Sequence, residues 1–449
     1  MMGYKLMGYC TKKLEESYYI FPKKRIDNEL QVLEVNEIGK EILDMLKKGL
    51  EIDEIVSYIL LEYEVDDKDM IKYDILSFFS VLKKFGILQV KGKQIDEYDN
   101  RIDDTISIAD GLKKYQLLQK FYAEKQLPYK FFVELTYNCN LRCRHCYKTE
   151  DVIEAKSSPV YLEKEVVFSV LDEIENLDVI EVYLTGGEVF LHPDIIEIIE
   201  YASNKNFRLI ILSNGNVLEK DDIINKIKEL EIYDIRISIY GNSKSHDEMT
   251  RVKGSFEKSI NALKKIKQAM GIGTAVYVVT KENYKDCTEL VKFFKDEKIN
   301  YSLNTHLTPT SYGELFPLDF RVTKEQYECL HKDYEMPLVG TSCSAGLSRF
   351  RITPFGDVNP CELIRNVTFG NVHGKSIQKI IESDERKQFI KEFSSMAEQH
   401  NCNACKMQNY CNFCPAMFFL ENGSYNIPSK YLCELTAIKS KIAMEKMNV

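Results

Sequence analysis

Three cysteines fall within one short segment of the sequence, at Cys139, Cys143 and Cys146. The segment directly follows an apolar, strand-like run at residues 131–135. Three thiolates at this spacing can bind one corner of an iron–sulfur cube, and because a [4Fe–4S] cluster takes four ligands, one iron stays open. An open iron is a site for chemistry as well as a store for electrons. The alternative is a zinc knuckle, in which Cys and His side chains bind one ion tetrahedrally.

The spacing Cys-x3-Cys-x2-Cys, with the aromatic residue His145 before the last cysteine, resembles the signature of the radical S-adenosylmethionine (SAM) enzymes. The resemblance implies that Cys139, Cys143 and Cys146 are catalytic as well as metal ligands. In that family the open iron chelates the amino and carboxylate groups of SAM. One electron then cleaves SAM to a 5′-deoxyadenosyl radical, which abstracts hydrogen.

Composition narrows the class of protein. A chain of 449 residues predicts about two to four domains. The net charge of −9 argues against a general nucleic-acid binder. The sequence has neither an eighteen-residue apolar run nor an N-terminal signal core, so we expect a cytoplasmic protein that does not enter a membrane. The 13 cysteines of such a chain indicate metal ligands rather than disulfides, in an oxygen-poor cell.

Residues 1–95 predict a small N-terminal domain with a winged-helix-like order of elements. The predicted elements are strands at 17–22 and 30–35, helices at 37–48 and about 51–63, a third helix from near Asp66, and a returning strand at 85–88. The third helix carries several aspartates, which would repel the phosphates of DNA.

The pattern of residues 16–92 resembles the peptide-recognition domain of the biosynthesis of RiPPs, which are ribosomally made and post-translationally modified peptides. The residues that carry the resemblance are 35–39, Ile42, Gly49, 55–56, Tyr63, Asp74, Phe78, Leu82 and 86–88. It implies that the leader of a precursor peptide adds as a strand to the sheet edge and lies against the third helix. The alternative is a purely structural cap. Residues 96–128 are predicted to be a linker with a bridging helix.

Residues 129–320 alternate strands with helices, which predicts a parallel sheet with right-handed crossovers. The predicted strands are 131–135, 180–184, 208–213, 234–239, 274–279 and 299–304, with a helix at 162–177 among those between them. Six such units make an α/β fold with a partial (β/α)6 TIM-like barrel. Functional loops of this architecture follow the carboxyl ends of the strands, as the Cys139–Cys146 loop does.

The segment Gly186-Gly187-Glu188 follows the second predicted strand. Glycines let the backbone approach a ligand closely, and the carboxylate can accept from an ammonium. The segment resembles the Gly-Gly-Glu motif that holds the methionyl amine of SAM, although Val189 stands where the family often has Pro.

Three further positions resemble SAM-binding positions of the family. Asn214 lies in a Ser-Asn-Gly segment after strand three, and Ser238 ends strand four, where Tyr240 replaces a frequent acidic residue. The resemblance implies that Ser238 contacts the ribose and that Arg251 binds the SAM carboxylate, an arrangement suited to an Arg fork. Arg251 has the alternative role of tying down a loop, and His246 is expected to be structural rather than a base.

Residues 321–449 are predicted to form a bridging region and an auxiliary-cluster domain. The seven cysteines from residue 343 onward resemble the SPASM domain, which carries two auxiliary [4Fe–4S] clusters. The resemblance assigns Cys402, Cys405, Cys411 and Cys433 to one cluster and Cys343, Cys361 and Cys414 to the other, so that the chain would hold three clusters. A zinc ribbon is the alternative for residues 402–414 alone, and the remaining cysteines count against it.

Two clusters want eight ligands, and only these seven cysteines are available. Sulfatase maturases have an additional cysteine shortly before the first of them, whereas residues 335–339 contain none. The inner auxiliary cluster, of Cys343, Cys361 and Cys414, is therefore expected to have an open iron, unless Cys329 supplies the fourth ligand. Cys10 and Cys287 are expected to be ordinary thiols.

An open auxiliary iron can bind and deprotonate a substrate cysteine. A carbon radical formed nearby on the peptide can then couple to that sulfur, while the leftover electron enters the cluster. We therefore expect a maturase that makes sactipeptide- or ranthipeptide-like thioether crosslinks, with flavodoxin or ferredoxin as electron donor. The alternatives are a carbon–carbon crosslinking or other radical peptide maturase, a formylglycine-forming sulfatase maturase, and a non-catalytic peptide carrier or electron-transfer protein.

Overall fold

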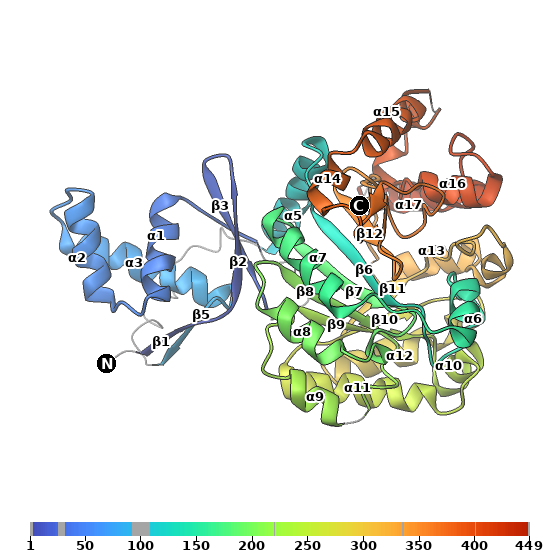
Figure 1. The fold of residues 1–449 in the computed structure, drawn as a ribbon, viewed down its shortest axis with the longest axis horizontal. Helices are drawn as coiled ribbons and strands as arrows, with labels where there is room; N and C mark the ends of the chain where they lie inside the picture. The colour runs from blue at the N-terminus through green and yellow to red at the C-terminus, as the bar shows by residue number, and fades with distance from the viewer. Residues whose placement is uncertain are drawn as a thin grey trace. The chain divides into compact units, whose positions relative to one another are not determined.

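The computed structural model of the protein describes residues 3–25, 32–91, 108–219, 221–334, 336–399 and 401–447 (Figure 1). The chain divides into two compact units. The first comprises residues 1–121, 206–209 and 231–233, and the second comprises 122–205, 210–230 and 234–449. The predicted linker falls largely on residues 92–107, outside the described residues. Helix α5 (Ile108–Glu124) lies in the segment where a bridging helix was predicted, and its bridging role stays a prediction.

Within the described residues 3–91, the N-terminal unit forms two small antiparallel sheets and three helices. Its elements are β1 (Gly3–Leu6), β2 (Tyr9–Leu14), β3 (Ser17–Pro22), β4 (Leu33–Val35), α1 (Glu37–Lys47), α2 (Ile52–Glu62), α3 (Lys68–Lys84) and β5 (Leu88–Lys91). The sheet order is β2-β3-β4, and β1 pairs with β5. The three helices and the strand at 17–22 confirm the prediction. Strands β1 and β2 were not predicted, and residues 30 and 31 of the second predicted strand lie outside the described residues.

Local sequence fixes where these helices begin. The Asn36 side chain accepts from the backbone N–H of Gly39 at 2.9 Å, and the Asp67 side chain accepts from that of Met70 at 2.9 Å. Each cap satisfies a backbone donor that has no partner within its helix. The apolar faces of the helices then pack together, so that Ile55 and Phe79 are fully buried.

The second unit is built on a nine-stranded sheet in the order β11-β10-β9-β8-β7-β6-β12-β13-β14. Its first six strands are β6 (Lys130–Thr136), β7 (Glu181–Gly186), β8 (Arg208–Ser213), β9 (Asp234–Ile239), β10 (Thr274–Val278) and β11 (Asn300–Asn304). These are the six predicted strands, and the β6–β7, β8–β9, β9–β10 and β10–β11 pairings are parallel. The α/β class and the partial parallel barrel are therefore confirmed.

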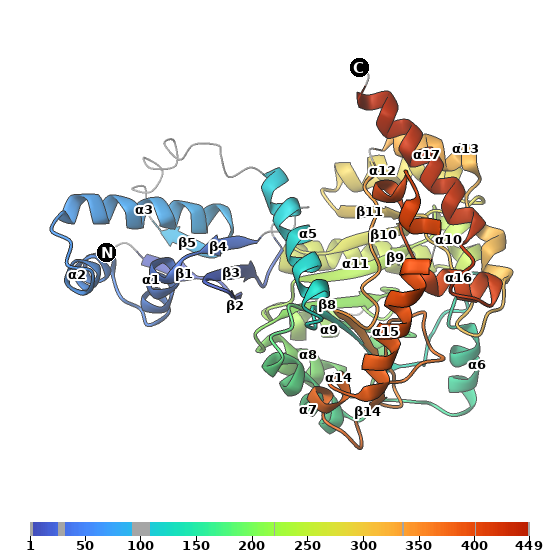
Figure 2. The ribbon, with the colours of Figure 1, turned by 90° about the horizontal axis from the view of Figure 1, so that it is seen from above.

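Helices cover the outside of this sheet, as the two views in Figures 1 and 2 show. They include α7 (Lys164–Asn176), α8 (Ile195–Ser203), α9 (Asp221–Ile227), α10 (Ser243–Thr250), α11 (Ser255–Met270) and α12 (Cys287–Asp296). The predicted helix at 162–177 corresponds to α7. None of the helices in the described part of the chain has both the length and the apolar character needed to cross a bilayer.

The C-terminal part of the chain adds a strand to the barrel sheet, which was not predicted. Strand β12 (Arg349–Ile352) pairs in parallel with β6, and β13 (Asp357–Asn359) and β14 (Gly370–Asn371) follow in antiparallel order. Phe350 stacks on Phe131 across the β12–β6 pair, with ring centroids 5.1 Å apart. The segment after residue 343 is thereby attached to the strand that leads into the Cys139–Cys146 loop.

Five helices complete the C-terminal region: α13 (Lys324–Asp333), α14 (Ile377–Ile381), α15 (Asp384–Gln399), α16 (Pro415–Asn422) and α17 (Lys430–Met447). Helices α16 and α17 lie side by side in both views (Figures 1 and 2). Helix α17 also packs on α13.

The N-terminal unit offers a test of its core. Replacing Ile55 by Ala removes buried side-chain atoms, so we expect a loss of about 2–5 kcal/mol in the stability of this unit. Hydrogen exchange of amides in residues 37–84 measures the change without requiring the whole chain to unfold. Leu61, on the same helix and 82% exposed, is the matched control, and Leu61→Ala should change stability by less than about 0.5 kcal/mol. Equal effects of the two substitutions would contradict this packing.

Candidate active site

The loop of Cys139, Cys143 and Cys146 lies between β6 and helix α6 (Thr149–Ser157). Backbone hydrogen bonds attach it to the end of α10, where the N–H groups of Arg142 and Arg144 donate to the carbonyls of Thr250 and Met249 at 3.1 and 2.9 Å. All three cysteines line one cavity of about 350 Å³. The structure therefore brings together the three sulfurs that the sequence singled out.

The thiols in this loop are in a setting that disfavours charge. Burial raises the pKa of Cys143 well above its usual range, and the neighbouring sulfurs of Cys146 and Cys139 raise it further. Burial also raises the pKa of Cys146. Buried thiols that crowd one another stay protonated on their own, whereas metal coordination removes the proton. The set therefore suits a positively charged metal centre.

Two glycines at the end of β7 let the backbone pass directly over this loop. Gly186 has a φ of +151°, and a Cβ there would lie 2.2 Å from the carbonyl oxygen of Thr136. A Cβ on Gly187 would lie 2.5 Å from the carbonyl oxygen of Asn138. The N–H groups of Gly187 and Glu188 donate to those two carbonyls, each at 2.8 Å. Only glycine permits this contact, which joins the Gly-Gly-Glu segment to the base of the cysteine loop.

The carboxylate of Glu188 is buried against the end of β8. It accepts from the Ser213 hydroxyl at 2.7 Å, from the Asn214 backbone N–H at 2.7 Å and from the Phe190 N–H at 3.2 Å. Glu188 is absent from the cavity lining, whereas Gly186, Gly187 and Asn214 belong to it. In this structure the carboxylate orients the Ser-Asn-Gly turn, and the amine-binding role predicted for it stays a prediction.

The remaining predicted SAM-binding positions differ in placement. Asn214 and Ser238 line the cavity, and the Asn214 side chain donates to Asn140 in the cysteine loop at 2.7 Å. Arg251 is exposed and does not line it. Arg251 ends α10 with a φ of 57°, a left-handed conformation that turns the chain toward the next helix. The structure thus gathers Asn214 and Ser238 at the site and leaves Arg251 outside it.

Tyr240 lies at the position where the family often has an acidic residue. Its hydroxyl hydrogen-bonds the Cys143 sulfur, and its ring packs edge-on against His145 with centroids 4.7 Å apart. Its backbone N–H donates to Nδ1 of His246 at 3.2 Å. His246 is fully buried, and its burial lowers its pKa to about 4. A neutral, buried ring that accepts from the backbone fits the structural role expected of His246.

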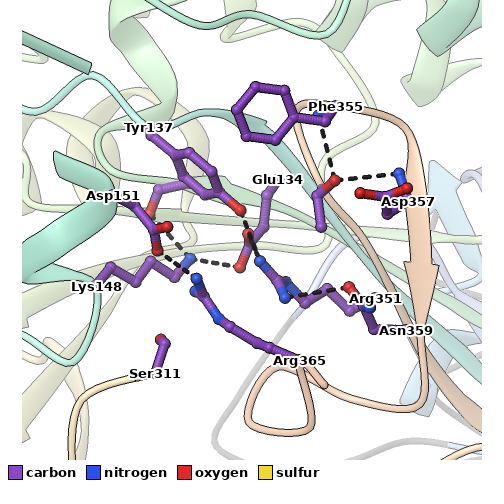
Figure 3. A network of polar contacts seen from close by, with 12 residues as sticks. Glu134, Tyr137, Lys148, Asp151, Ser311, Arg351, Phe355, Asp357, Asn359 and Arg365 are labelled. Carbon is purple, nitrogen blue, oxygen red and sulfur yellow. Dashed lines mark hydrogen bonds and ion pairs between the residues drawn. The ribbon is translucent and has the colours of Figure 1, made fainter. Parts of the chain in front are cut away.

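A buried ionic network lies behind the cysteine loop and was not predicted (Figure 3). Glu134 on β6 is fully buried and receives Lys148 Nζ at 2.6 Å and Arg351 Nη2 at 2.7 Å. Lys148 lines the cavity and also donates to the Gly186 carbonyl at 3.3 Å. Arg351 belongs to β12 and also donates to the Tyr137 hydroxyl at 2.7 Å. A single glutamate inside an apolar strand was the available sequence signal for this network.

The network extends toward the C-terminal cysteines. Arg365, four residues after Cys361, pairs with Asp151 on α6, as Figure 3 shows. Burial alone would raise the pKa of Glu134, but Arg351 and Lys148 outweigh it and hold that pKa well below its usual range. Glu134 is therefore ionised at neutral pH and neutralises two buried cations.

The C-terminal cysteines form two groups in space. Burial raises the pKa of Cys343, and Cys414 and Cys361 raise it further as direct neighbours. The pKa of Cys402 is raised to about 11 by burial and by Cys433, Cys411 and Cys405. The four residues of this outer set line a cavity of about 280 Å³, which Cys343 also reaches. The grouping is the one that the SPASM resemblance assigned.

The three other cysteines lie apart from these groups. Cys329 is exposed on α13, where it hydrogen-bonds Tyr284. Cys10 and Cys287 are buried free thiols. Within the described residues no three Cys, His, Asp or Glu side chains are arranged closely enough to hold a single metal ion. A four-iron cube is larger than one ion and requires more widely spaced thiolates.

Family models match both halves of this site. The model of the radical SAM superfamily matches residues 133–294, and the model of the SPASM iron–sulfur cluster-binding domain matches residues 343–406. The chain is a radical SAM enzyme with a SPASM domain. SAM and [4Fe–4S] clusters are the cofactors typical of these two domains, and the buried thiols and the glycine approach described above fit them.

Individual relatives extend this comparison. The antilisterial bacteriocin subtilosin biosynthesis protein AlbA of Bacillus subtilis is 25% identical over 316 residues, which cover 65% of this chain and 68% of AlbA. Streptococcus suis SuiB, solved with its precursor peptide SuiA, has a TM-score of 0.58 at 16% identity and covers 96% of this chain and 100% of its own. The structure of native anSMEcpe with bound AdoMet has a TM-score of 0.55 at 16% identity, and the match covers 71% of this chain and 98% of anSMEcpe. These likenesses to solved structures establish the fold.

The ionic network provides a stability test of the site. Glu134→Gln leaves Lys148 and Arg351 buried without a counter-charge, so we expect it to destabilise the protein by about 3–5 kcal/mol at pH 7. The folded-state pKa of Glu134 is depressed, so its contribution is complete above the usual value of 4.5 and falls as the pH drops below it. Urea unfolding followed by circular dichroism from pH 7 to pH 3 measures this difference.

A matched control for this test is Glu197→Gln, which removes the exposed partner of Lys164. It should change stability by no more than about 1 kcal/mol at any pH. A difference between wild type and Glu134→Gln that grows toward acidic pH would contradict the assignment of Glu134 as the ionised centre of the network.

Proposed function

We propose that this enzyme installs thioether crosslinks, between cysteine sulfur and carbon, in a ribosomally made precursor peptide. The observation that carries the proposal is the inner auxiliary set of Cys343, Cys361 and Cys414. The cysteines that raise the pKa of Cys343 are Cys414 and Cys361, whereas Cys329 hydrogen-bonds Tyr284. Three thiolates on a [4Fe–4S] cluster leave an iron that can accept a substrate thiolate. The relation to a subtilosin biosynthesis protein supports a peptide as substrate.

The N-terminal unit supports recognition of a leader peptide. Strand β4 ends the sheet order β2-β3-β4, and within the described residues no further strand pairs with its outer edge. An open edge can receive an extended peptide through main-chain hydrogen bonds. The likeness to SuiB spans 96% of this chain, whereas that to anSMEcpe spans 71%. A fold with this additional unit favours a leader-dependent peptide maturase over a sulfatase maturase.

The chain's own residues prepare the site for the reaction. When bound, SAM and the cluster at Cys139, Cys143 and Cys146 supply a 5′-deoxyadenosyl radical. The backbone at Gly186 and Gly187, together with Asn214 and Ser238, provides the SAM-binding wall, and Glu188 orients the Asn214 turn. Arg251 lies outside the cavity and takes no part in this proposal. Cys402, Cys405, Cys411 and Cys433 would hold the outer auxiliary cluster, for three clusters in total.

The overall stoichiometry is balanced. Forming one thioether breaks a C–H bond and an S–H bond of the peptide and forms one C–S bond. The C–H hydrogen leaves as an atom and ends in 5′-deoxyadenosine, and the S–H hydrogen leaves as a proton. Clusters held by the cysteine sets would accept the remaining electron, and a flavodoxin or ferredoxin would supply the electron needed to cleave SAM. Each crosslink therefore removes two hydrogens from the peptide.

A product assay tests this proposal. Under anaerobic conditions with SAM and dithionite, the cognate precursor peptide should lose the mass of two hydrogens per crosslink as 5′-deoxyadenosine appears. Thiol alkylation then separates the alternatives, since a thioether blocks one cysteine per crosslink and a carbon–carbon crosslink blocks none. Products that keep all their alkylatable cysteines would refute thioether formation, and formylglycine would support the sulfatase-type alternative.

Iron content tests the proposed ligands. We expect Cys361→Ser to lower the iron of the reconstituted protein from about twelve to about eight per chain, because it removes one of only three thiolates on the inner cluster. Cys329→Ser is the matched control and should keep all the iron, since the Cys329 thiol is hydrogen-bonded to Tyr284. Loss of the same amount of iron from Cys329→Ser would identify Cys329 as a ligand and remove the open site.

A further inference from the structure

Lys439 on α17 is a buried cation without a carboxylate partner. Its side chain is 3% exposed, and its Nζ donates only to the Val339 carbonyl and to Oδ1 of Asn412, each at 3.4 Å. No acidic side chain of the described residues forms an ion pair with it. Burying an ammonium in this way is costly unless a negative charge compensates it.

Several other buried cations of this unit have a carboxylate partner, and the buried Arg386 instead donates to four backbone carbonyls at 2.7–3.0 Å. Lys148 and Arg351 share Glu134, and Arg321 pairs with Glu421 at 2.5 Å. The two contacts of Lys439 are longer than these ion pairs and involve neutral oxygens. They therefore do not compensate its positive charge, and another group must do so.

The nearest source of negative charge is the outer cysteine set. Burial lowers the pKa of Lys439 to about 8, and Cys411 is the group that counteracts this effect. Asn412, which receives the ammonium, directly follows Cys411 in the chain. Lys439 and Asn412 line a cavity of about 240 Å³ that shares Thr436 with the cavity of the four outer cysteines. The ammonium therefore lies immediately behind the outer set.

The same helix positions both a cysteine and the cation. Cys433, Thr436 and Lys439 follow one another at intervals of three residues on α17, and residues three apart are neighbours on a helix surface. Lys441, only two residues further on, points elsewhere and pairs with Glu328 at 3.1 Å and with Glu445 at 3.8 Å. Lys439 is therefore buried and lies on the side of α17 near the cysteines, whereas Lys441 is exposed and lies on another side of the same helix.

We propose that Lys439 is the counter-charge of the cluster held by Cys402, Cys405, Cys411 and Cys433, and that its ammonium favours the reduced state of that cluster. A [4Fe–4S] cluster with four thiolates carries net negative charge, which increases by one on reduction. A fixed positive charge nearby stabilises the reduced form more than the oxidised form, and cluster potentials respond to nearby charge and burial. The inference rests on the ligand set of the proposed function and on no other part of it.

The test is a redox titration of the reconstituted full-length protein, followed by electron paramagnetic resonance. Cys139, Cys143 and Cys146 are replaced by Ala in every sample, so that only the auxiliary clusters contribute. At the ambient potential where the outer cluster is half reduced, we expect Lys439→Met to lower its reduced-to-oxidised ratio about tenfold. This corresponds to about 59 mV for a one-electron couple. The signal of the inner cluster should stay unchanged.

Two further variants separate charge from packing. Lys439→Arg keeps the positive charge and should keep the parental ratio, and Lys441→Met removes an exposed charge of the same helix and should leave both signals unchanged. If Lys439→Met fails to retain the outer cluster, loss of about four irons in this variant but not in Lys439→Arg also supports the counter-charge.

Several results would overturn the inference. They are an unchanged ratio in Lys439→Met, an equal change in Lys439→Arg, an equal change in Lys441→Met, and absence of the outer cluster from the parent protein. The titration uses no peptide, so failure of crosslinking leaves its result intact. Conversely, a Lys439→Met protein with an unchanged potential would leave the crosslinking proposal standing.

Discussion

The buried carboxylate of Glu134 is the constraint on which the site depends. It lies on the strand that leads into the cysteine loop, and it binds one cation from the segment after that loop and one from β12. Neither Lys148 nor Arg351 could be buried without it. The pairing of β12 with β6 and the position of the loop are therefore coupled through one charge. Because β12 lies between Cys343 and Cys361 in the chain, this charge connects the SPASM region to the radical SAM loop.

Backbone contacts impose a second constraint, on the side of the loop opposite to β12. The N–H groups of Gly187 and Glu188 use carbonyls at the start of the loop, and a side chain at Gly186 or Gly187 would collide with them. The Glu188 carboxylate then accepts from the Asn214 N–H, which fixes the Gly-Gly-Glu segment to the end of β8. The first three strands of the barrel are thus tied together at their carboxyl ends, where the cavity opens. Rigid attachment of this kind keeps the cavity-lining groups in a fixed relation to the three thiols.

The sequence allowed the barrel and the cysteine groups to be predicted for physical reasons. Alternating apolar strands and amphipathic helices produce a periodic signal, so all six barrel strands were located. The Cys139–Cys146 loop is local, and its spacing restricts what it can bind. Strand β12 was missed because it spans only four residues, two of them arginines, and its partner β6 lies more than 200 residues earlier. Arg351 and Lys148 gave no local signal, since their function depends on a glutamate in another segment.

The two auxiliary cysteine groups differ in how the fold assembles them. Three of the outer four lie within ten residues of one another, and Cys433 joins them from the start of α17. The inner three arrive separately: Cys343 precedes β12, Cys361 follows β13, and Cys414 precedes α16. Only the β12–β13 hairpin brings Cys343 and Cys361 together, and that hairpin is fixed to the barrel through β6. The positions of Cys343 and Cys361 therefore depend on the folded barrel, through the pairing of β12 with β6 and the ion pair of Arg351 with Glu134. These two cysteines are thus positioned by a hairpin that is fixed to the strand leading into the Cys139–Cys146 loop.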